Sequence, residues 1–187
     1  EWIVILDHDD IMYPERLQIH YDFIINNLDK KIFFGNCKIL NDHQNTNKFN
    51  DFIKRNNISP VNFNNHKDYL FLLIKYGCFI SSSTLAIKKD LFKKIKFKED
   101  LKVIADYDFL LKNCDKNIFY AIDKNLIEYN SHSNQISNKF KILEKKELIK
   151  IFIVMLFYKR VNFLTKINLI FINLKNIILY NKYKYFS

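Results

Sequence analysis

The chain begins with an apolar run that leads directly into carboxylates. Residues 2–6 read Trp-Ile-Val-Ile-Leu and are followed by Asp7, Asp9 and Asp10. An uninterrupted apolar run of this kind is typical of a strand buried in an α/β sheet. Apolar residues then recur three or four positions apart, which predicts an amphipathic helix over residues 14–28. A strand followed directly by a helix indicates an α/β fold.

The same two periodicities continue through the middle of the chain. Further strands or helices are expected at residues 32–40, 67–76, 79–88, 90–95, 103–113 and 118–129. The last of these ranges predicts two short strands, broken at residues 123–125, and Gly77 is placed to cap the helix that ends at Tyr76. Residues 41–66 are polar and rich in Asn, so we expect a long loop with a short helix at residues 52–55. From residue 139 onward the pattern is helical.

Composition supports a folded domain in a reducing compartment. The chain is 49% hydrophobic and 16% aromatic, which is enough apolar surface to build a core. Its three cysteines, Cys37, Cys78 and Cys114, are widely spaced and form no Cys-x-x-Cys pair. This pattern argues against a disulfide framework and against a zinc site.

The positive charge is concentrated at the C-terminal end. Residues 139–187 carry 11 Lys and Arg against 2 Asp and Glu, a net charge of +9, whereas residues 1–138 have a net charge of +1. The apolar blocks at 151–157 and 167–179 are short or interrupted, so we expect peripheral contact with an anionic membrane and no membrane span. The alternative is that these helices pack on the rest of the chain and expose their lysines to water. No nucleic-acid recognition motif accompanies the charge, so no nucleic-acid partner is expected.

Asp7 and Asp9 are the first candidates for chemistry. Carboxylates two residues apart on a strand project to the same side and can converge on one cation. Mg²⁺ and Mn²⁺ favour such oxygen ligands and are often shared with a diphosphate. The alternative is that these are solvated turn aspartates, one of which caps the helix that follows.

Four segments in order resemble family 2 glycosyltransferases of the GT-A fold. The first, WIVILDHDDIMYPERLQ, resembles the region around the Asp-x-Asp motif of that family. CFISSSTLAIKKDLFKKIKF resembles its acceptor-side segment, VIADYDFLLK its acidic–aromatic motif, and YNSHSNQIS its short His-containing stretch. Together the four segments lie within residues 1–137, and their order makes the match more specific than any one of them.

The resemblance implies a fold and a domain organisation. Residues 1–138 would form the C-terminal part of a GT-A (nucleotide-diphospho-sugar transferase) domain, and residues 139–187 a basic helical appendage. The strand–helix units that hold the nucleotide base and ribose in this family would precede the first strand. We therefore expect the chain to be the C-terminal piece of such a domain.

The resemblance also assigns roles to single residues. Asp9 and Asp7 would bind Mn²⁺ or Mg²⁺ and the nucleotide-sugar, with Asp10 a weaker candidate, and His132 would lie near the diphosphate. Asp106 would be the catalytic base, although Ala105 replaces the Glu that precedes it in the family pattern. Two further interpretations come from the residues themselves: Ser81, Ser82 and Ser83 could contact the acceptor, and Asp108 suits a structural cap or ion pair.

The implied function is transfer of a sugar, with inversion, from a nucleotide-sugar donor to a hydroxyl of a glycan or lipid-linked acceptor. The setting would be bacterial surface-glycan biosynthesis, in the cytoplasm and peripheral at the inner face of the cell membrane. Three alternatives stay open. The chain could be a non-catalytic remnant, a split subunit that needs a separate N-terminal piece, or a membrane-interface interaction module.

Overall fold

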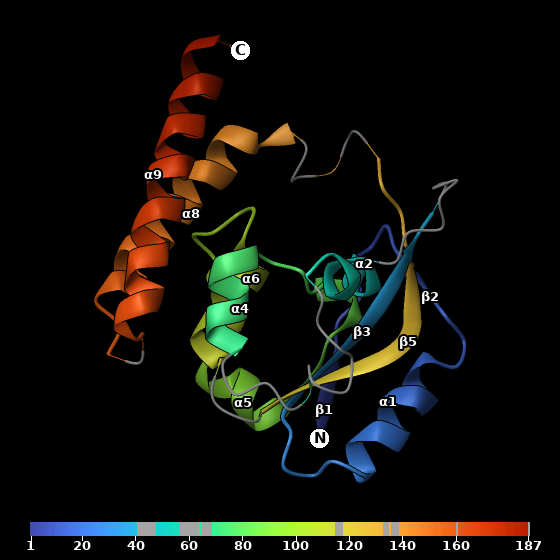
Figure 1. Ribbon diagram of the computed structural model, residues 1–187. Helices are drawn as coiled ribbons and strands as arrows, with labels where there is room; N and C mark the ends of the chain where they lie inside the picture. Colours follow the sequence, from blue (N-terminus) through green and yellow to red (C-terminus); the bar gives the residue numbers. More distant parts are fainter. Residues whose placement is uncertain are drawn as a thin grey trace. The chain divides into compact units, whose positions relative to one another are not determined.

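The computed structural model describes residues 1–40, 48–56, 64, 69–114, 118–132, 135, 139–159 and 161–186. Among these residues it contains one mixed β-sheet and several helices (Figure 1). The strands are β1 (Trp2–Val4), β2 (Ile11–Met12), β3 (Ile32–Ile39), β4 (Ala86–Lys88) and β5 (Phe119–Tyr129). The α-helices are α1 (Arg16–Ile25), α2 (Lys48–Arg55), α4 (Tyr69–Tyr76), α5 (Lys89–Lys94), α6 (Ala105–Asn113), α8 (Lys141–Leu156) and α9 (Phe163–Phe186). A 3₁₀ helix, η1, covers Ser82–Thr84. The expected α/β class is thus present.

The chain divides into two compact units. The first consists of Glu1–Tyr69, Cys78–Lys96 and Cys114–Ser131 and contains the sheet. The second consists of Leu70–Gly77, Phe97–Asn113 and His132–Ser187, and so groups most of α4 and all of α6 with α8 and α9. These units describe compactness, not independent folding, so the domain boundary expected after residue 138 stays a prediction.

In the first unit, the strand order β1-β4-β3-β5-β2 brings several loops to one edge of the sheet. β3 and β5 are parallel, whereas β1–β4, β3–β4 and β2–β5 are antiparallel pairs. It follows that β1, β3 and β5 run in the same direction, and β4 starts at the edge where these three strands end. The segments after β1, before β4 and after β5 therefore lie along the same edge.

The core of the first unit lies on both faces of the sheet. Phe33 and Phe34 are adjacent on β3 and point to opposite faces. Phe33 packs in a cluster that Ile19 and Phe23 of α1 also contact. Phe34 meets Phe49 of α2, with the ring centroids 5.3 Å apart. Because β3 is buried on both sides, its sequence reads as a nearly continuous apolar run.

Four predicted features of the middle of the chain are confirmed. The helix expected over 67–76 is present as α4, and Gly77 caps it with a positive φ of 78°. The Gly77 N–H donates to the carbonyl of Leu73 at 2.9 Å, which satisfies one of the last carbonyls of the helix. The strand expected over 32–40 is β3, and the helix expected over 103–113 is α6.

Other boundaries were wrong. The helix expected from residue 14 begins at Arg16, because the two preceding residues form a turn. The strand expected over 79–88 is reduced to β4, since Ser82–Thr84 form η1. The two strands expected over 118–129 are one strand, β5, whose register against β3 shifts around Asn36 so that residues 123 and 124 form a bulge. Most of the loop expected over 41–66 lies outside the described residues; its short helix is present as the longer α2.

The second unit is held together by helix packing. α8 and α9 run side by side as a hairpin (Figure 1). Tyr107 of α6 packs edge-on against Phe152 of α8, with the ring centroids 6.2 Å apart. Its hydroxyl donates to the carbonyl of Leu73 on α4 at 2.6 Å. α6 therefore contacts both α4 and α8 through one tyrosine.

Candidate functional site

The carboxylates that follow β1 sit on a tight turn at the edge of the sheet. β1 ends at Val4, and the Asp10 N–H donates to the Asp7 carbonyl at 3.2 Å, which closes a turn over Asp7–Asp10. Asp9 is therefore not part of a strand. The expectation that strand alternation aligns Asp7 with Asp9 was wrong in its geometry, because the chain turns before reaching Asp9.

Two serines from the segment before β4 fix the first carboxylate of this turn. The Ser82 hydroxyl donates to Asp7 Oδ2 at 2.8 Å. The Asp7 N–H donates to Ser83 Oγ at 3.0 Å. Ser83 is fully buried, so the idea that it contacts an acceptor is wrong; its oxygen holds the backbone of the turn.

Asp10 anchors the other end of the turn to the segment after β5. The Asn130 N–H donates to Asp10 Oδ1 at 3.1 Å. Burial raises the pKa of Asp10, while Ser83 and the Asn130 amide lower it, and the charges of Asp7 and Asp9 raise it. The charges of Asp7 and Asp9 therefore act on Asp10. Asp10 is a structural anchor in this arrangement rather than an exposed ligand.

A buried arginine and histidine lie behind the turn. Arg16 of α1 is fully buried, and its Nη2 donates to the carbonyl of Ile5 at 2.7 Å and to that of Leu85 at 3.4 Å. Burial lowers the pKa of Arg16 to about 10, and the charge of Asp10 opposes this shift. His20, one helical turn along α1, is also buried. Arg16 thus links the end of β1 to the start of β4.

Asp7 and Asp9 are the residues of this turn that could hold a cation. Asp7 is exposed, and the Asp9 side chain is 22% exposed with an oxygen 4.0 Å from His8 Nδ1. Within the described part of the chain, no three His, Cys, Asp or Glu side chains gather into a metal site. Two carboxylates fit a hard cation that takes its other ligands from water and a diphosphate, and they do not fit zinc.

The remaining predicted site residues belong to the second unit. Asp106 lies in the first turn of α6, where its Oδ1 accepts from the Tyr107 N–H at 2.8 Å. His132 follows β5 by three residues and is also grouped there. Asp7 and Asp9 are in the first unit, so their sharing of one cleft with Asp106 and His132 stays a prediction. Asp108 is buried and paired with Lys112, as its structural interpretation predicted.

A glutamate from α8 positions the start of α6. Both carboxylate oxygens of Glu147 accept backbone N–H groups, from Lys102 at 2.9 Å, Val103 at 3.1 Å and Ile104 at 3.2 Å. Glu147 is itself buried. A carboxylate that binds three consecutive amides fixes the chain that enters α6, and hence the place from which Asp106 projects.

The chain is similar to three curated proteins, each named an uncharacterized glycosyltransferase. It is 29% identical over 131 residues to one from Methanocaldococcus jannaschii, a match that covers 69% of this chain and 41% of that protein. It is 29% identical to a protein of Rickettsia conorii and 30% identical to one of Rickettsia felis, each over 142 residues. Each of these matches covers 74% of this chain and 22% of the relative. The chain thus spans less than half of the curated relatives it matches. No family model matches the chain.

These names support the interpretation of the chain as a glycosyltransferase. They do not extend to family 2 or to the GT-A fold. A mixed sheet with helices is compatible with such a domain.

A pocket of about 210 Å³ in the first unit is lined by Lys31, Lys88, Asp90, Leu91 and Lys94, none of which was a predicted site residue.

Sequence reasoning missed the residues that support the turn. Arg16 and His20 are four residues apart on α1 and read as polar surface positions, although both are buried. A buried role could have been inferred only from their position on one side of the helix, next to an acidic turn. Asn130 was also missed, because it acts through its backbone N–H and any residue but proline could supply that donor.

Proposed function

We propose that the chain carries the catalytic part of an inverting, metal-dependent glycosyltransferase with a family 2, GT-A architecture. The observation that carries the proposal is the acidic turn Asp7–Asp10 at the edge of the sheet, fixed by Ser82 and Asn130. The three similar proteins, all named glycosyltransferases, support it independently. The donor would be a nucleotide-sugar, and the acceptor a glycan or lipid-linked hydroxyl in bacterial surface-glycan assembly.

In this proposal Asp9 and Asp7 hold Mn²⁺ or Mg²⁺. Their carboxylates offer oxygen ligands and leave positions for a diphosphate. Bound there, the cation would neutralise the negative charge that grows on the leaving diphosphate. Ser82 would hold the Asp7 carboxylate in place by donating to its Oδ2. His132 is proposed to contact the diphosphate.

Asp106 is proposed as the catalytic base. Its carboxylate takes the proton of the acceptor hydroxyl as the acceptor oxygen bonds to the anomeric carbon. The bond from that carbon to the diphosphate breaks at the same time, and its electron pair leaves with the nucleoside diphosphate. Attack from the face opposite the leaving group inverts the anomeric centre. Glu147 supports this step by fixing the backbone that leads into α6.

Replacing the base tests the proposed reaction. Asp106→Asn should lower turnover by roughly 10²–10⁴-fold, because no carboxylate then accepts the proton, and should leave donor affinity nearly unchanged. Both are measured in a longer protein that contains this chain, or in a chimera in which this chain replaces the 131 matching residues of the M. jannaschii protein. Asp100→Asn is the matched control, since Asp100 is exposed in the same unit. An equal loss of donor affinity would assign Asp106 to nucleotide binding or structure.

The cation site is tested separately by Mn²⁺ binding, followed by electron paramagnetic resonance in the presence of a nucleoside diphosphate. Asp9→Asn and Asp7→Asn should each weaken binding about tenfold or more, because each removes one charged ligand. Asp22→Asn, on the exposed side of α1, should leave it unchanged. Unchanged Mn²⁺ affinity in both turn variants would contradict the metal assignment.

A further inference from the structure

Helix α9 of the C-terminal hairpin buries several polar side chains and exposes several large apolar ones. The side of α9 that packs toward α8 carries the buried polar residues Thr165, Asn173 and Asn176 together with the fully buried Leu169. Within the described part of the chain, Thr165 Oγ1, Asn173 Oδ1 and Asn176 Nδ2 have no hydrogen-bond partner. A helix of a soluble protein normally buries its apolar side and exposes its polar side.

The outward side of α9 is apolar. We define the apolar face of α9 as six of its Phe, Leu and Ile side chains, each of them 48% or more exposed, which are Phe163, Leu164, Ile170, Phe171, Leu174 and Ile178. At about 100° per residue these six positions fall within an arc of roughly 120°. An exposed apolar patch with polar residues along its borders marks a surface that binds protein or membrane.

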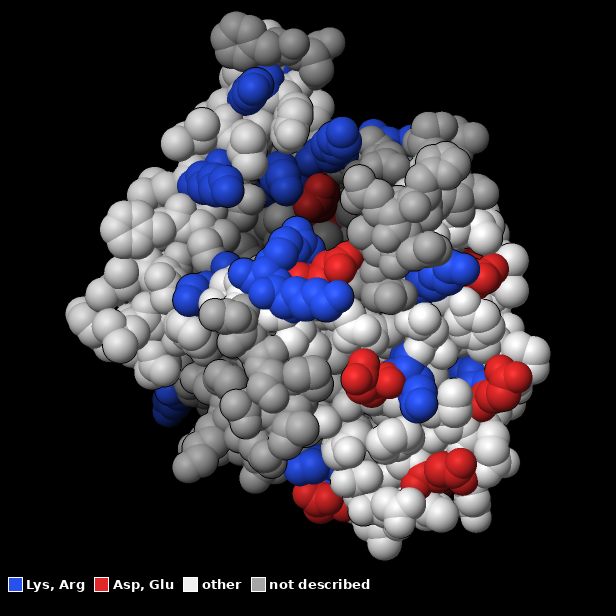
Figure 2. All heavy atoms as spheres, turned by 45° about the vertical axis from the view of Figure 1, so that its right-hand side comes forward, with Lys and Arg blue, Asp and Glu red and all other residues white. Residues whose placement is uncertain are grey.

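Lysines border this face on both sides. On the same helical wheel Lys175 lies about 20° beyond one border of the apolar face and Lys166 about 40° beyond the other. Lys182 and Lys184 follow near the end of the helix, and α9 contains no acidic residue. Lys184 Nζ lies over the rings of Tyr180 and Tyr185, at 5.9 Å and 5.1 Å from their centroids. Figure 2 shows basic side chains near the C-terminal end of α9.

We infer that the apolar face of α9 binds the surface of an anionic lipid bilayer, with the helix axis in the membrane plane. In this orientation the apolar face enters the acyl region, while Lys166 and Lys175 reach anionic headgroups on either side. Tyrosine and lysine side chains at the end of a helix suit the headgroup region. The inference gives a specific surface to the membrane contact expected from charge, and it does not depend on the proposed transferase activity.

The charge pattern disfavours the two other arrangements. Phe163–Tyr185 is long and apolar enough to cross a membrane, by length and composition only. Lys175, however, is near the middle of that segment, where a charge is least tolerated, so an in-plane helix is favoured. Pairing two copies through the same face would bring their bordering lysines together without an acidic residue on α9 to neutralise them.

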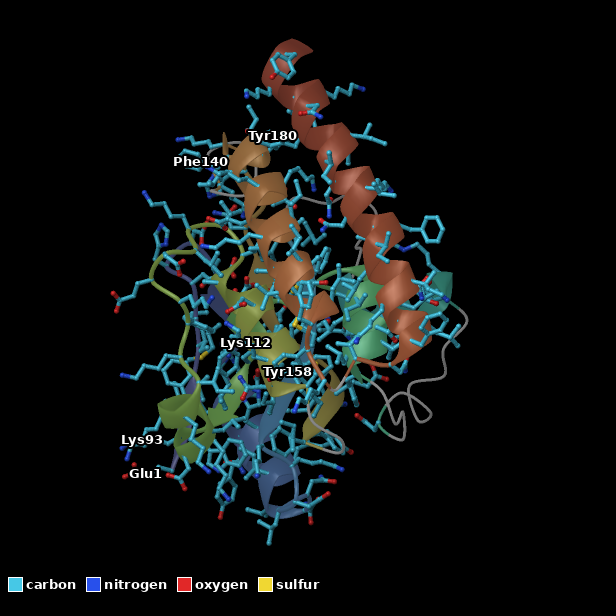
Figure 3. All side chains as sticks on the ribbon, turned by 90° about the vertical axis from the view of Figure 1, so that its left-hand side faces the viewer. Glu1, Lys93, Lys112, Phe140, Tyr158 and Tyr180 are labelled. Atoms are coloured by element: carbon cyan, nitrogen blue, oxygen red, sulfur yellow. The ribbon has the colours of Figure 1, made fainter. Side chains whose placement is uncertain are left out.

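The hairpin turn extends the apolar face. Phe157, at the end of α8, is 82% exposed, and Val154 in the last turn of α8 is also exposed. Figure 3 shows Phe140 and Tyr180 at one end of the hairpin and Tyr158 at the other. The exposed apolar residues near Tyr158 lead into Phe163 and Leu164 at the start of α9.

Vesicle flotation of the 187-residue chain tests the inference. The wild-type chain should bind vesicles containing about one-third phosphatidylglycerol, less so at high salt, and bind neutral phosphatidylcholine vesicles weakly. The double variant Phe171→Ser, Ile178→Ser should bind at least tenfold more weakly, as should Lys166→Gln, Lys175→Gln. The matched control is Leu17→Ser, Leu28→Ser, which removes two apolar residues that are 53% and 75% exposed in the first unit; its binding should equal that of wild type.

The depth at which α9 inserts can be measured without a variant that loses vesicle binding. Trp2 is the only tryptophan, so Trp2→Phe, Phe171→Trp gives a single probe on the apolar face. Its emission should shift to the blue on anionic vesicles, and lipids brominated near the headgroup should quench it more than lipids brominated near the bilayer centre.

Three outcomes would overturn the inference. The first is equal vesicle binding by the wild type and the face variant, or no binding by the wild type. The second is strongest quenching by lipids brominated at the bilayer centre, which indicates a spanning helix. The third is a wild-type dimer in sedimentation that dissociates in the face variant, which assigns this face to a second copy of the chain.

Discussion

At the residue scale, the acidic turn depends on buried charge that is only partly compensated. Arg16 has two backbone carbonyls as acceptors, and its Nε and Nη1 have no partner within the described part of the chain. Its charge is offset by Asp10 across the cluster. Because a buried ion is costly without a partner, these two residues are coupled, and removing either one leaves the other charge uncompensated.

His20 makes the stability of the first unit depend on pH. Burial, and next the charge of Arg16, lower the pKa of His20 to about 4, from 6.5 in an unfolded chain. Between these values the unfolded chain binds a proton that the folded chain does not. The stabilisation is therefore complete above about pH 6.5 and is lost as the pH falls toward 4. The loss should reach up to about 3 kcal/mol.

Urea unfolding followed by Trp2 fluorescence measures this effect, because Trp2 packs on Phe33 in the same unit, with the ring centroids 5.4 Å apart. His20→Gln should remove the decrease in unfolding free energy between pH 6.5 and 4 that is due to His20. His8→Gln is the control, since the His8 side chain is 96% exposed. If wild type and His20→Gln keep the same pH dependence, His20 is not the titrating group.

At the scale of elements, Glu147 makes α8 a structural support for α6. Its carboxylate accepts three consecutive amides ahead of α6, and these would otherwise be unsatisfied helix-terminal donors. Tyr107 and Phe152 add a ring contact between the same two helices. The C-terminal helices therefore contribute to the placement of Asp106, a role that their basic composition did not suggest.

Glu147→Gln should loosen the start of α6. The amide keeps an acceptor oxygen but loses its charge, so the unfolding free energy should fall by about 1–2 kcal/mol. Hydrogen exchange should become faster at the amides of residues 102–104. Glu144→Gln is the control on the same helix, because Glu144 is partly exposed and pairs with the neighbouring Lys145. Unchanged exchange at residues 102–104 in Glu147→Gln would show that the carboxylate charge is not needed there.

Periodicity predicted the helices better than the strands, for a physical reason. α4 and α6 are each dense in buried residues over a helix-length range, and local capping at Gly77 marks where α4 ends. β4 is only three residues long. Ser81 and Leu85, which precede it, are buried but do not belong to the strand. The sequence pattern therefore predicted too long a strand. The bulge in β5 depends on its register with β3, which residues far apart in the chain determine.

The candidate site shows the same limit. Asp7 and Asp9 were predicted because a cluster of carboxylates after an apolar strand is visible in the sequence. The turn that carries them is fixed by Ser82, Asn130 and Arg16, whose partners are 11 or more residues away in the chain. Such contacts follow from tertiary packing, so the sequence pattern could name the ligand candidates but not their supports.

At the scale of the whole molecule, the chain combines a sheet unit that carries the acidic turn with a helical unit that carries Asp106 and the basic hairpin. The relatives it matches are longer, since the match covers 41% of the M. jannaschii protein and 22% of each Rickettsia protein. The proposed GT-A architecture places contacts to the donor's base and ribose in stretches of the relatives that this chain does not match. The two halves of donor binding would then reside in different stretches of sequence.

We accordingly expect the 187-residue chain alone to transfer no sugar at a measurable rate, because it spans less than half of the relatives it matches and the proposed architecture places nucleotide contacts in the unmatched stretches. The measurement is transfer from a set of radiolabelled nucleotide-sugars, together with calorimetric binding of the nucleoside diphosphates. A chimera is the informative comparison: the 131 matching residues of the M. jannaschii protein are replaced by those of this chain. Any transfer found for the intact M. jannaschii protein should survive in the chimera, and should fall when Asp9→Asn or Asp106→Asn is introduced. An inactive but folded chimera would identify the chain as a non-catalytic remnant, whereas robust transfer by the 187 residues alone would show that the core from Glu1 onward suffices for donor binding.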